Sequence, residues 1–227
     1  MLNTPLLTQL RNSAGLLGIA VLFGGCAHTD TVPFPAPQTA APPAALLPIW
    51  QPNPVMVGQL SPETSLKEYA LRLPPGYVPL DAALLKNLQP YALDLYLWQH
   101  TGDAPTLSFF DVTVIRRANS ETPANVLDKV VDSVNQRYGA DFSRSKTEVG
   151  SINSLPFART YWQRIEKRES GSMITSGFTY ATVTGEKGVF IEASDMQPCP
   201  GQPCSYQPGS SSQIPVLEAA VLTFRQQ

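Results

Sequence analysis

Few side chains in this sequence have the types and spacing that catalysis requires. The chain has two histidines, His28 and His100, and a Ser-His-Asp hydrolase would have to use His100, because His28 lies close to Cys26 and a proline-rich stretch. No Gly-x-Ser-x-Gly elbow accompanies it, so we expect His100 to be an exposed turn residue. The sequence also lacks the His-Glu-x-x-His motif, the glycine-rich phosphate loop and the EF-hand spacing. We therefore expect no metal and no cofactor.

Paired carboxylates are the one catalytic arrangement that the sequence leaves open. Asp94 and Asp111 interrupt apolar segments, where an unpaired carboxylate is costly. A glycosidase needs only two carboxyl groups, at a separation that a sequence does not reveal. The simpler interpretation is that each aspartate pairs with a basic side chain or lies at a sheet edge. A polysaccharide hydrolase stays as an alternative.

Aromatic residues are the candidates for binding. Trp98, Tyr161 and Trp162 could line a groove for a sugar or a peptide, because such rings offer flat apolar surfaces with one polar atom. Packing in a hydrophobic core explains the same residues more simply.

The three cysteines are an odd number, which leaves one thiol over in an oxidising compartment. Cys199 and Cys204 flank Pro-Gly-Gln-Pro, where a disulfide would stabilise the fold by about 2 kcal/mol. Free thiols, a redox role or a zinc role are the alternatives, although the spacing is not Cys-x-x-Cys and no histidine is near. A Cys199–Cys204 disulfide would leave Cys26 as the odd cysteine.

Cys26 follows a stretch that has the order of a bacterial secretory signal. The basic Arg11 precedes an apolar run over residues 14–23, and two glycines follow it. Residues 23–26, Phe-Gly-Gly-Cys, resemble the lipobox of bacterial lipoproteins, with Phe23 in the position of the usual aliphatic residue. The resemblance implies cleavage after residue 25 and acylation of Cys26. An ordinary cleaved signal or an uncleaved helix are the alternatives, but about ten to twelve apolar residues are few for a bilayer span of roughly 20.

The same resemblance implies a location. In such lipoproteins an aspartate directly after the acylated cysteine favours retention in the inner membrane, and Ala27 occupies that position here. We therefore expect a lipid-anchored protein of the outer membrane that faces the periplasm.

Composition divides the chain into a signal at residues 1–25, the lipidated cysteine with a Pro/Ala-rich tether at residues 26–56, and one globular domain at residues 57–227. Residues 32–54 contain eight prolines and show no helix or strand periodicity. In polyproline geometry the tether could hold the domain up to roughly 80 Å from the bilayer. Its segment Leu46–Trp50 is unusually apolar, and it either lies on the domain surface or docks to a partner.

Charge excludes one class of partner. Cleavage after residue 25 removes Arg11 and changes the net charge from −2 to about −3. An acidic domain gives no electrostatic reason to bind nucleic acid or anionic lipid.

Strand patterns dominate the expected domain. Alternating apolar residues predict strands at 68–73 and 91–99. A strand at 106–116 is apolar on both faces and must be covered on both sides. Four more strands are expected at residues 143–149, 157–167, 173–184 and 188–193, and residues 185–187 join the last two as a hairpin.

Two helices complete the expected domain. Thr122 as N-cap and Pro123 at the first helical position begin a helix whose apolar residues recur at helical spacing as far as Gly139. A second helix is expected over residues 215–225. Consecutive strands with few, separated helices predict an α+β fold, an antiparallel sheet of about six to seven strands with a helix packed on each face.

This element order resembles the Mog1/PsbP-like proteins. The resemblance is carried by the pattern Leu-Pro-Pro-Gly-Tyr at residues 73–77 after an early strand, by the single capped helix after a strand pair, and by the closing helix. The proline tether and the Cys199–Cys204 loop depart from the family pattern. The resemblance implies an α/β/α sandwich and an accessory or binding role, with no catalytic residues to carry over.

These observations predict a noncatalytic, lipid-anchored module that binds another protein of the cell envelope. The alternatives are an envelope hydrolase that acts on peptidoglycan or polysaccharide through paired carboxylates, and a small-ligand carrier. The carrier would need a sizeable apolar pocket between sheet and helix.

Overall fold

The computed structural model describes residues 46–81, 92–102, 107–118, 120–169, 171–199, 204 and 213–227. The residues from Leu47 to Gln227 form one compact unit, so this unit starts earlier than the boundary expected at residue 57. Cys26 and His28 lie outside the described residues, as does most of the expected tether. Among the described helices, none is long and apolar enough to cross a membrane.

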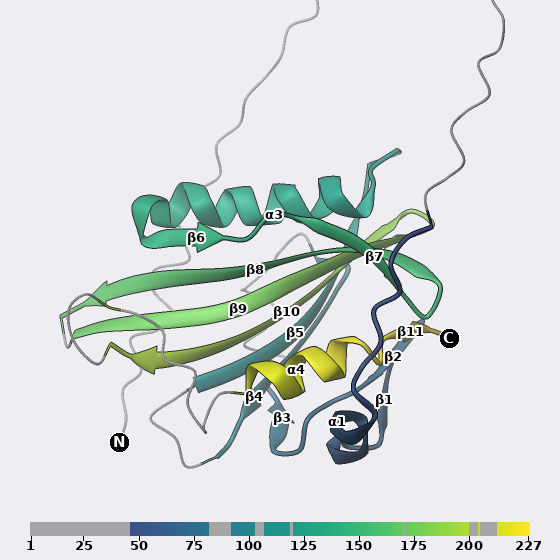
Figure 1. Ribbon diagram of the computed structural model, residues 1–227, viewed down its shortest axis with the longest axis horizontal. Helices are drawn as coiled ribbons and strands as arrows, with labels where there is room; N and C mark the ends of the chain where they lie inside the picture. Colours follow the sequence, from purple (N-terminus) through teal and green to yellow (C-terminus); the bar gives the residue numbers. More distant parts are fainter. Residues whose placement is uncertain are drawn as a thin grey trace, which may run out of the picture. The chain divides into compact units, whose positions relative to one another are not determined.

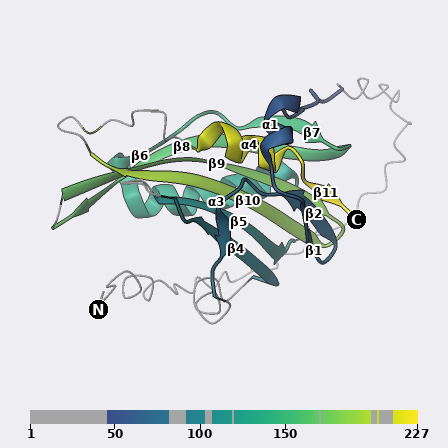
Figure 2. The same ribbon diagram turned by 90° about the horizontal axis from the view of Figure 1, so that it is seen from below.

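The main sheet has eight strands in the described part of the chain and is antiparallel throughout. Its order is β3–β4–β5–β10–β9–β8–β6, and β7 pairs with the other end of β8 (Figures 1 and 2). The strands are β3 (Tyr77–Pro79), β4 (Asp94–His100), β5 (Leu107–Arg116), β6 (Phe142–Arg144), β7 (Glu148–Ile152), β8 (Leu155–Arg168), β9 (Gly171–Thr184) and β10 (Lys187–Pro198). The strand expected at residues 143–149 is thus two strands, and the sheet is larger than the expected six to seven.

The hairpin between β9 and β10 is confirmed. Thr184 pairs with Lys187, so the turn consists of Gly185 and Glu186. Gly185 has a φ of 57°, the left-handed conformation that two-residue hairpin turns require and that glycine adopts at little cost.

The helix expected after Thr122 is also confirmed, as α3 (Pro123–Tyr138). Thr122 and Asn125 form a capping box, in which each side chain accepts a hydrogen bond from the other's backbone N–H. Apolar residues of α3 pack on one face of the sheet, and this cluster consists of Val126, Leu127, Val131, Ala158, Ala181 and Phe190. Figure 1 shows α3 lying along the long strands β8 and β9.

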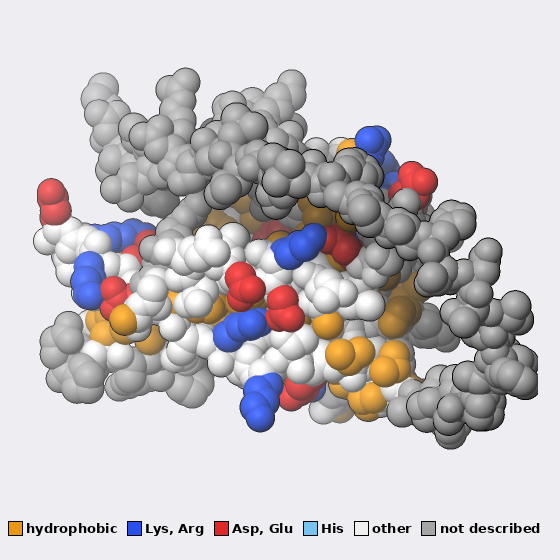
Figure 3. Space-filling model, turned by 90° about the horizontal axis from the view of Figure 1, so that it is seen from above, with side chains coloured by type: hydrophobic (Ala, Val, Ile, Leu, Met, Phe, Trp, Pro, Cys, Tyr) orange, Lys and Arg blue, Asp and Glu red, His pale blue; other side chains and the backbone are white. Residues whose placement is uncertain are grey.

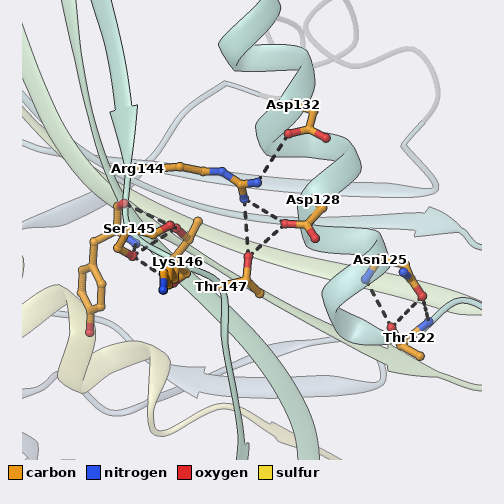
Figure 4. Close-up of polar contacts among 10 residues, drawn as sticks. Thr122, Asn125, Asp128, Asp132, Arg144, Ser145, Lys146 and Thr147 are labelled. Carbon is orange, nitrogen blue, oxygen red and sulfur yellow. Dashed lines mark hydrogen bonds and ion pairs between the residues drawn. The ribbon is translucent and has the colours of Figure 1, made fainter.

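Polar contacts hold the outer side of α3 to the β6–β7 connection (Figure 4). Arg144 donates to Asp128 of α3 at 2.8 Å and lies 3.6 Å from Asp132. Thr147 donates to the same Asp128 oxygen at 2.9 Å. These contacts fix the middle of the helix relative to the sheet edge.

The opposite face of the sheet is not covered by a single helix, as expected, but by a short helix together with a second, smaller sheet. Here α4 (Ile214–Val221) lies beside a three-stranded sheet of β1 (Glu63–Leu66), β2 (Tyr69–Arg72) and β11 (Arg225–Gln226), with α1 (Pro54–Gln59) next to α4. A helix of eight residues is only about 12 Å long. It is too short to cover this sheet, and side chains of β2 complete the core.

The largest core cluster lies on that face. It joins the apolar stripe expected for the last helix to the inner side chains of both sheets, and includes Leu71, Phe110, Phe157, Phe178, Tyr180, Leu217, Ala220, Val221 and Phe224. The helix ends at Val221, before the expected residue 225, and Phe224 is buried from the connection to β11. The fold is therefore α+β and dominated by antiparallel sheet.

Candidate functional site

The three aromatic residues expected to bind are not brought together. Trp98 on β4 is buried and packs edge-on against Phe110. Tyr161 and Trp162 are neighbours in β8, so their side chains lie on opposite faces of the sheet. Trp162 is buried on the α3 face, where its indole N–H donates to Thr179 at 3.0 Å. Tyr161 is partly exposed on the α4 face and is the member of the three that belongs to a polar cluster.

That cluster is centred on Arg159, which precedes Tyr161 by two residues in β8. The guanidinium carbon of Arg159 lies 4.3 Å from the ring centre of Trp50, 5.4 Å from that of Tyr161 and 5.9 Å from that of Tyr180. We call these four residues, with Glu218 of α4, the Arg159 cluster. Three rings around one cation is the geometry of cation–π attraction, each contact contributing roughly 0.5–1 kcal/mol when partly exposed.

Glu218 accepts three hydrogen bonds from the other residues of the cluster. Its Oε1 accepts from the Tyr180 hydroxyl at 2.8 Å, from Nη1 of Arg159 at 3.2 Å and from the Tyr161 hydroxyl. On its other side, Arg159 forms an ion pair with Glu148 of β7, with N–O distances of 2.8 and 2.9 Å. The cluster thereby links the sheet edge, the sheet centre and α4.

The tyrosines of the cluster are donors at neutral pH. Burial, together with the hydrogen bond to the Glu218 carboxylate and its charge, raises the pKa of Tyr161 to about 12, against the opposing charge of Arg159. Burial and the Glu218 charge also raise the pKa of the Tyr180 hydroxyl. Burial opposes the charge of Arg159, but hydrogen bonds with Tyr180 and Glu148 outweigh it and raise the pKa of the guanidinium.

Trp50 reaches the cluster from the segment that enters the domain. The backbone N–H of Trp50 donates to the carbonyl of Ser151 at 2.8 Å, and the N–H of Ser151 donates to the carbonyl of Pro48 at 2.9 Å. The indole lies against Gly150, where a Cβ atom would come within 2.4 Å of the Trp50 ring. The ring also packs edge-on against Tyr180, at 5.7 Å between centres. Of the two interpretations of the apolar segment, the structure shows residues 48–50 lying on the domain.

Exposed aliphatic side chains lie next to this docked segment. Ile49 forms a parallel bridge with Ser151 of β7 and is 69% exposed, while Leu47 and Val149, two residues earlier on the two paired segments, are 40% and 41% exposed. We call these three residues the entry strip. Figure 3 shows hydrophobic side chains gathered at the lower right, at the end of the molecule where β7 lies in Figure 1.

The two aspartates in apolar strands have different environments. Asp94 forms an ion pair with Lys67, which agrees with the simpler interpretation. Asp111 on β5 lies directly opposite Glu192 on β10, so two carboxylates are cross-strand neighbours with Cβ atoms about 5 Å apart. Glu192 was not among the residues expected from the sequence, although it interrupts the otherwise apolar strand Val189–Ala193 in the same way that Asp111 interrupts its own.

Glu192 borders a small cavity between α3 and the sheet. The cavity has a volume of ≈ 10 Å³, and is lined by Val130, Val131, Val134, Phe142, Trp162, Arg164, Thr179 and Glu192. This is about the space that one water molecule needs. Asp111 is not among the residues that line this cavity, and a sugar ring does not fit in it.

His100 and the cysteines complete the expected sites. The His100 ring packs against Tyr77, and its Nδ1 accepts from the N–H of Gly102 at 3.2 Å. The nearby buried serine, Ser108, donates to Asp195 at 2.6 Å. Cys199 and Cys204 form a disulfide, with Cα atoms 5.2 Å apart. Within the described ranges, no group of three or more His, Cys, Asp or Glu side chains could hold a metal ion.

Comparison with known proteins gives no family assignment. No protein-family model and no curated protein matches the sequence. Among solved structures, a Bacteroides thetaiotaomicron protein is 11% identical, with a TM-score of 0.40 over 70% of this chain and 45% of that one. The Pseudomonas aeruginosa protein of unknown function PA94 is 11% identical, with a TM-score of 0.37 over 60% of this chain and 83% of that one.

The human StarD13 lipid transfer and protein localization domain is 13% identical, with a TM-score of 0.30 over 65% of this chain and 89% of that one. This chain spans less than half of the Bacteroides protein. Likeness at these scores shows neither a shared family nor a shared function.

Proposed function

We propose that this protein is a noncatalytic lipoprotein of the cell envelope, acylated at Cys26, whose domain binds another envelope protein through the entry strip. The observation that carries the proposal is the docking of residues 48–50 on β7, which leaves Leu47, Ile49 and Val149 exposed side by side. The lipobox-like residues 23–26 and the proline-rich stretch that follows supply the anchor and the tether.

The strip itself suits a protein interface. Val149 pairs with Ala158 of β8, on the opposite side of the sheet from Arg159, and its side chain is exposed there together with Leu47 and Ile49. An exposed apolar group of this kind is typical of a binding surface. On this proposal the fold is a Mog1/PsbP-like variant of the α/β/α sandwich, and the protein faces the periplasm from the outer membrane.

The docked segment also shortens the tether. With the domain beginning at Leu47, about 20 residues separate it from Cys26. In polyproline geometry these span about 60 Å, which sets the distance from the bilayer at which a partner can be reached.

Site-specific crosslinking tests the proposal. A photoreactive amino acid at position 149 in the full-length protein should capture one envelope protein in intact cells. The matched control is position 78, because Val78 is 43% exposed and lies on β3 at the other edge of the sheet. Equal capture at both positions, or none at position 149, would contradict the binding surface. Mass spectrometry of the mature N-terminus tests acylation of Cys26 independently.

A second candidate is the envelope hydrolase, favoured by the cross-strand pair of Asp111 and Glu192. It requires that a peptidoglycan or polysaccharide strand displace α3 from the small cavity. Release of reducing ends from isolated cell walls, lost in both Asp111→Asn and Glu192→Gln, would support it. Without such release the pair has no hydrolytic role. A carrier of small ligands would need a cavity of roughly 300–1,000 Å³, much larger than the one under α3.

A further inference from the structure

The first residues of the domain are attached more loosely than the rest. None of the residues 46–59 is buried, whereas Leu60 is. The helix α1 within this stretch has six residues and no buried side chain, and a helix of this length is not stable alone in water. We call residues 46–59 the strap, and Figure 1 shows it in dark blue, running past β7 to α1.

Firm attachment begins directly after the strap. The side chain of Leu60 lies in the main core cluster. The guanidinium of Arg72 on β2 donates to the carbonyl of Leu60 at 2.7 Å and to that of Ser61 at 2.9 Å. The N–H of Ser61 donates to the carbonyl of Leu73 at 2.8 Å. The core therefore holds the chain from residue 60 onward, whether or not the strap is in place.

Two prolines limit the pairing of the strap with β7. Ile49 and Ser151 form an isolated parallel bridge, made by two backbone hydrogen bonds. Extension of this ladder in one direction would need the N–H of residue 48, and in the other direction the N–H of residue 52. Both residues are proline, which has no N–H to donate. The strap therefore cannot become a full strand of the sheet.

Trp50 carries the side-chain attachment of the strap to the sheet. The guanidinium carbon of Arg159 lies 4.3 Å from the centre of the indole, and the ring centre of Tyr180 lies 5.7 Å from it. These two contacts favour the docked strap by about thirtyfold. Ile49 and Val55, which also belong to the strap, are 69% and 70% exposed. One ring therefore decides whether the strap stays on the sheet.

We propose that the strap is a releasable latch, in which Trp50 leaves the Arg159 cluster and residues 46–59 detach while the core stays folded. Counted from the proposed anchor at Cys26, release lengthens the tether from about 20 to about 34 residues, and in polyproline geometry from about 60 Å to about 105 Å. The state of the latch therefore sets how far the domain reaches from the bilayer.

The latch also connects this reach to partner binding, a step that rests on the proposed function. The entry strip takes Leu47 and Ile49 from the strap and Val149 from β7, so it exists only while the strap is docked. A partner that contacts all three side chains binds the docked state alone and holds the tether short. By the same linkage, tension in the tether that opens the latch releases the partner.

Amide hydrogen exchange, followed by NMR in the full-length chain, tests the latch without a partner. The N–H groups of Trp50 and Ser151 bond between the strap and β7, so they should exchange together, with protection of about thirtyfold. The N–H of Ser61 lies beyond the strap and should be protected more than about a thousandfold. Equal protection at the three amides would mean that the strap opens only when the domain unfolds, and would overturn the proposal.

Trp50→Ala should leave the latch open. Protection at Ser151 should then fall to less than about threefold, while Ser61 stays protected by more than about a hundredfold. Val55→Ala, at a position of the strap that is 70% exposed, is the matched control and should keep the protection at Ser151. If Ser151 is protected equally in Trp50→Ala and in Val55→Ala, the ring does not hold the strap and the latch is refuted.

Photocrosslinking from position 149 tests the connection to partner binding. Capture of the partner should fall at least about tenfold in Trp50→Ala and stay unchanged in Val55→Ala. Equal capture with and without Trp50 would contradict the connection. Absence of capture in the unsubstituted protein refutes the proposed binding surface instead, and the exchange rates at Trp50 and Ser151 then decide the latch.

Discussion

A methyl group added at Gly150 should have a large effect that depends on Trp50. The Cβ of an alanine would lie 2.4 Å from Cε2 of Trp50, closer than two carbon atoms can approach. Overpacking of this kind costs about 1–3 kcal/mol. The indole can escape by leaving its place, so the cost of Gly150→Ala cannot exceed what the docked Trp50 contributes.

That contribution can be estimated from the contacts of the indole. Its cation–π contact with Arg159 contributes about 0.5–1 kcal/mol, and its edge-on contact with Tyr180 about 0.5–1.5 kcal/mol. We therefore expect Trp50→Ala and Gly150→Ala to destabilise the domain by about 2 kcal/mol each. With Trp50 gone, the added methyl has space and restricts the unfolded chain, so Gly150→Ala becomes neutral or stabilising by about 0.5 kcal/mol.

The assay is urea unfolding followed by far-ultraviolet circular dichroism, since tryptophan fluorescence would change with Trp50 itself. The double variant should be about as stable as Trp50→Ala alone, which gives a coupling energy of about 2 kcal/mol. Gly58→Ala is the control, because nothing lies within 4 Å of a Cβ built there, and its effect should add to that of Trp50→Ala. If the double variant Gly150→Ala/Trp50→Ala instead lost about 4 kcal/mol, the sum of the two single losses, the docked geometry would be refuted.

Three further predictions follow from single contacts. Thr122→Ala should destabilise the domain by about 1 kcal/mol in the same assay, because it removes the side-chain acceptor of the capping box; Ser133→Ala on the exposed side of α3 is the control, and an equal loss there would argue against the cap. Reduction of Cys199–Cys204 should lower the unfolding free energy by about 2 kcal/mol. A Cys199→Ser/Cys204→Ser variant should show no change in stability on reduction, and a loss of stability on reduction in that variant would contradict the role of this disulfide. Because the pKa of Tyr161 is raised to about 12, its phenolate absorbance should appear only well above pH 10, and folded-state stability should fall as the pH rises from about 10 towards 12. Tyr161→Phe should lessen this loss, and Glu218→Gln should move the Tyr161 titration to lower pH; an unshifted titration in Glu218→Gln would contradict the hydrogen-bonded cluster.

Elements with a local signal were predictable. The capped helix after Thr122 agrees with α3 at both ends, because the N-cap, the proline at the first turn and Gly139 act within a few residues of one another. The strands from 155 to 198 are long, and apolar repetition over so many residues is a strong signal. The α+β class follows from these elements.

Short elements were not predictable. The strands β1, β3 and β11 have four, three and two residues, too few for a period to appear. β11 exists because its partner β2 lies beside it in the fold, although about 150 residues separate them in the chain. For the same reason the last helix ends at Val221, where Phe224 gains more by burial against Tyr69 and Phe157 than by continuing the helix.

The candidate site shows the same division. Tyr161 was identified from its residue type. Its partners Arg159 and Glu218 come together only because α4 lies on the face of the sheet that carries these side chains of β8. Asp111 was identified as a carboxylate in an apolar strand, and its neighbour Glu192 is set by the register of β5 against β10. Trp98 and Trp162 were identified by the same aromatic criterion and lie in separate parts of the core.

The sequence by itself determined what local chemistry and periodicity encode. These features are the helix at residues 123–138, the β9–β10 hairpin, the closely spaced Cys199 and Cys204, the strand-rich class and the expectation of an anchor at Cys26. Only the tertiary structure decided which charges meet, where the entering segment docks and which aliphatic side chains stay exposed. The physical reason is that strand register and packing join residues far apart in the chain, and a shift of one residue in register would turn Glu192 away from Asp111 to the other face of the sheet.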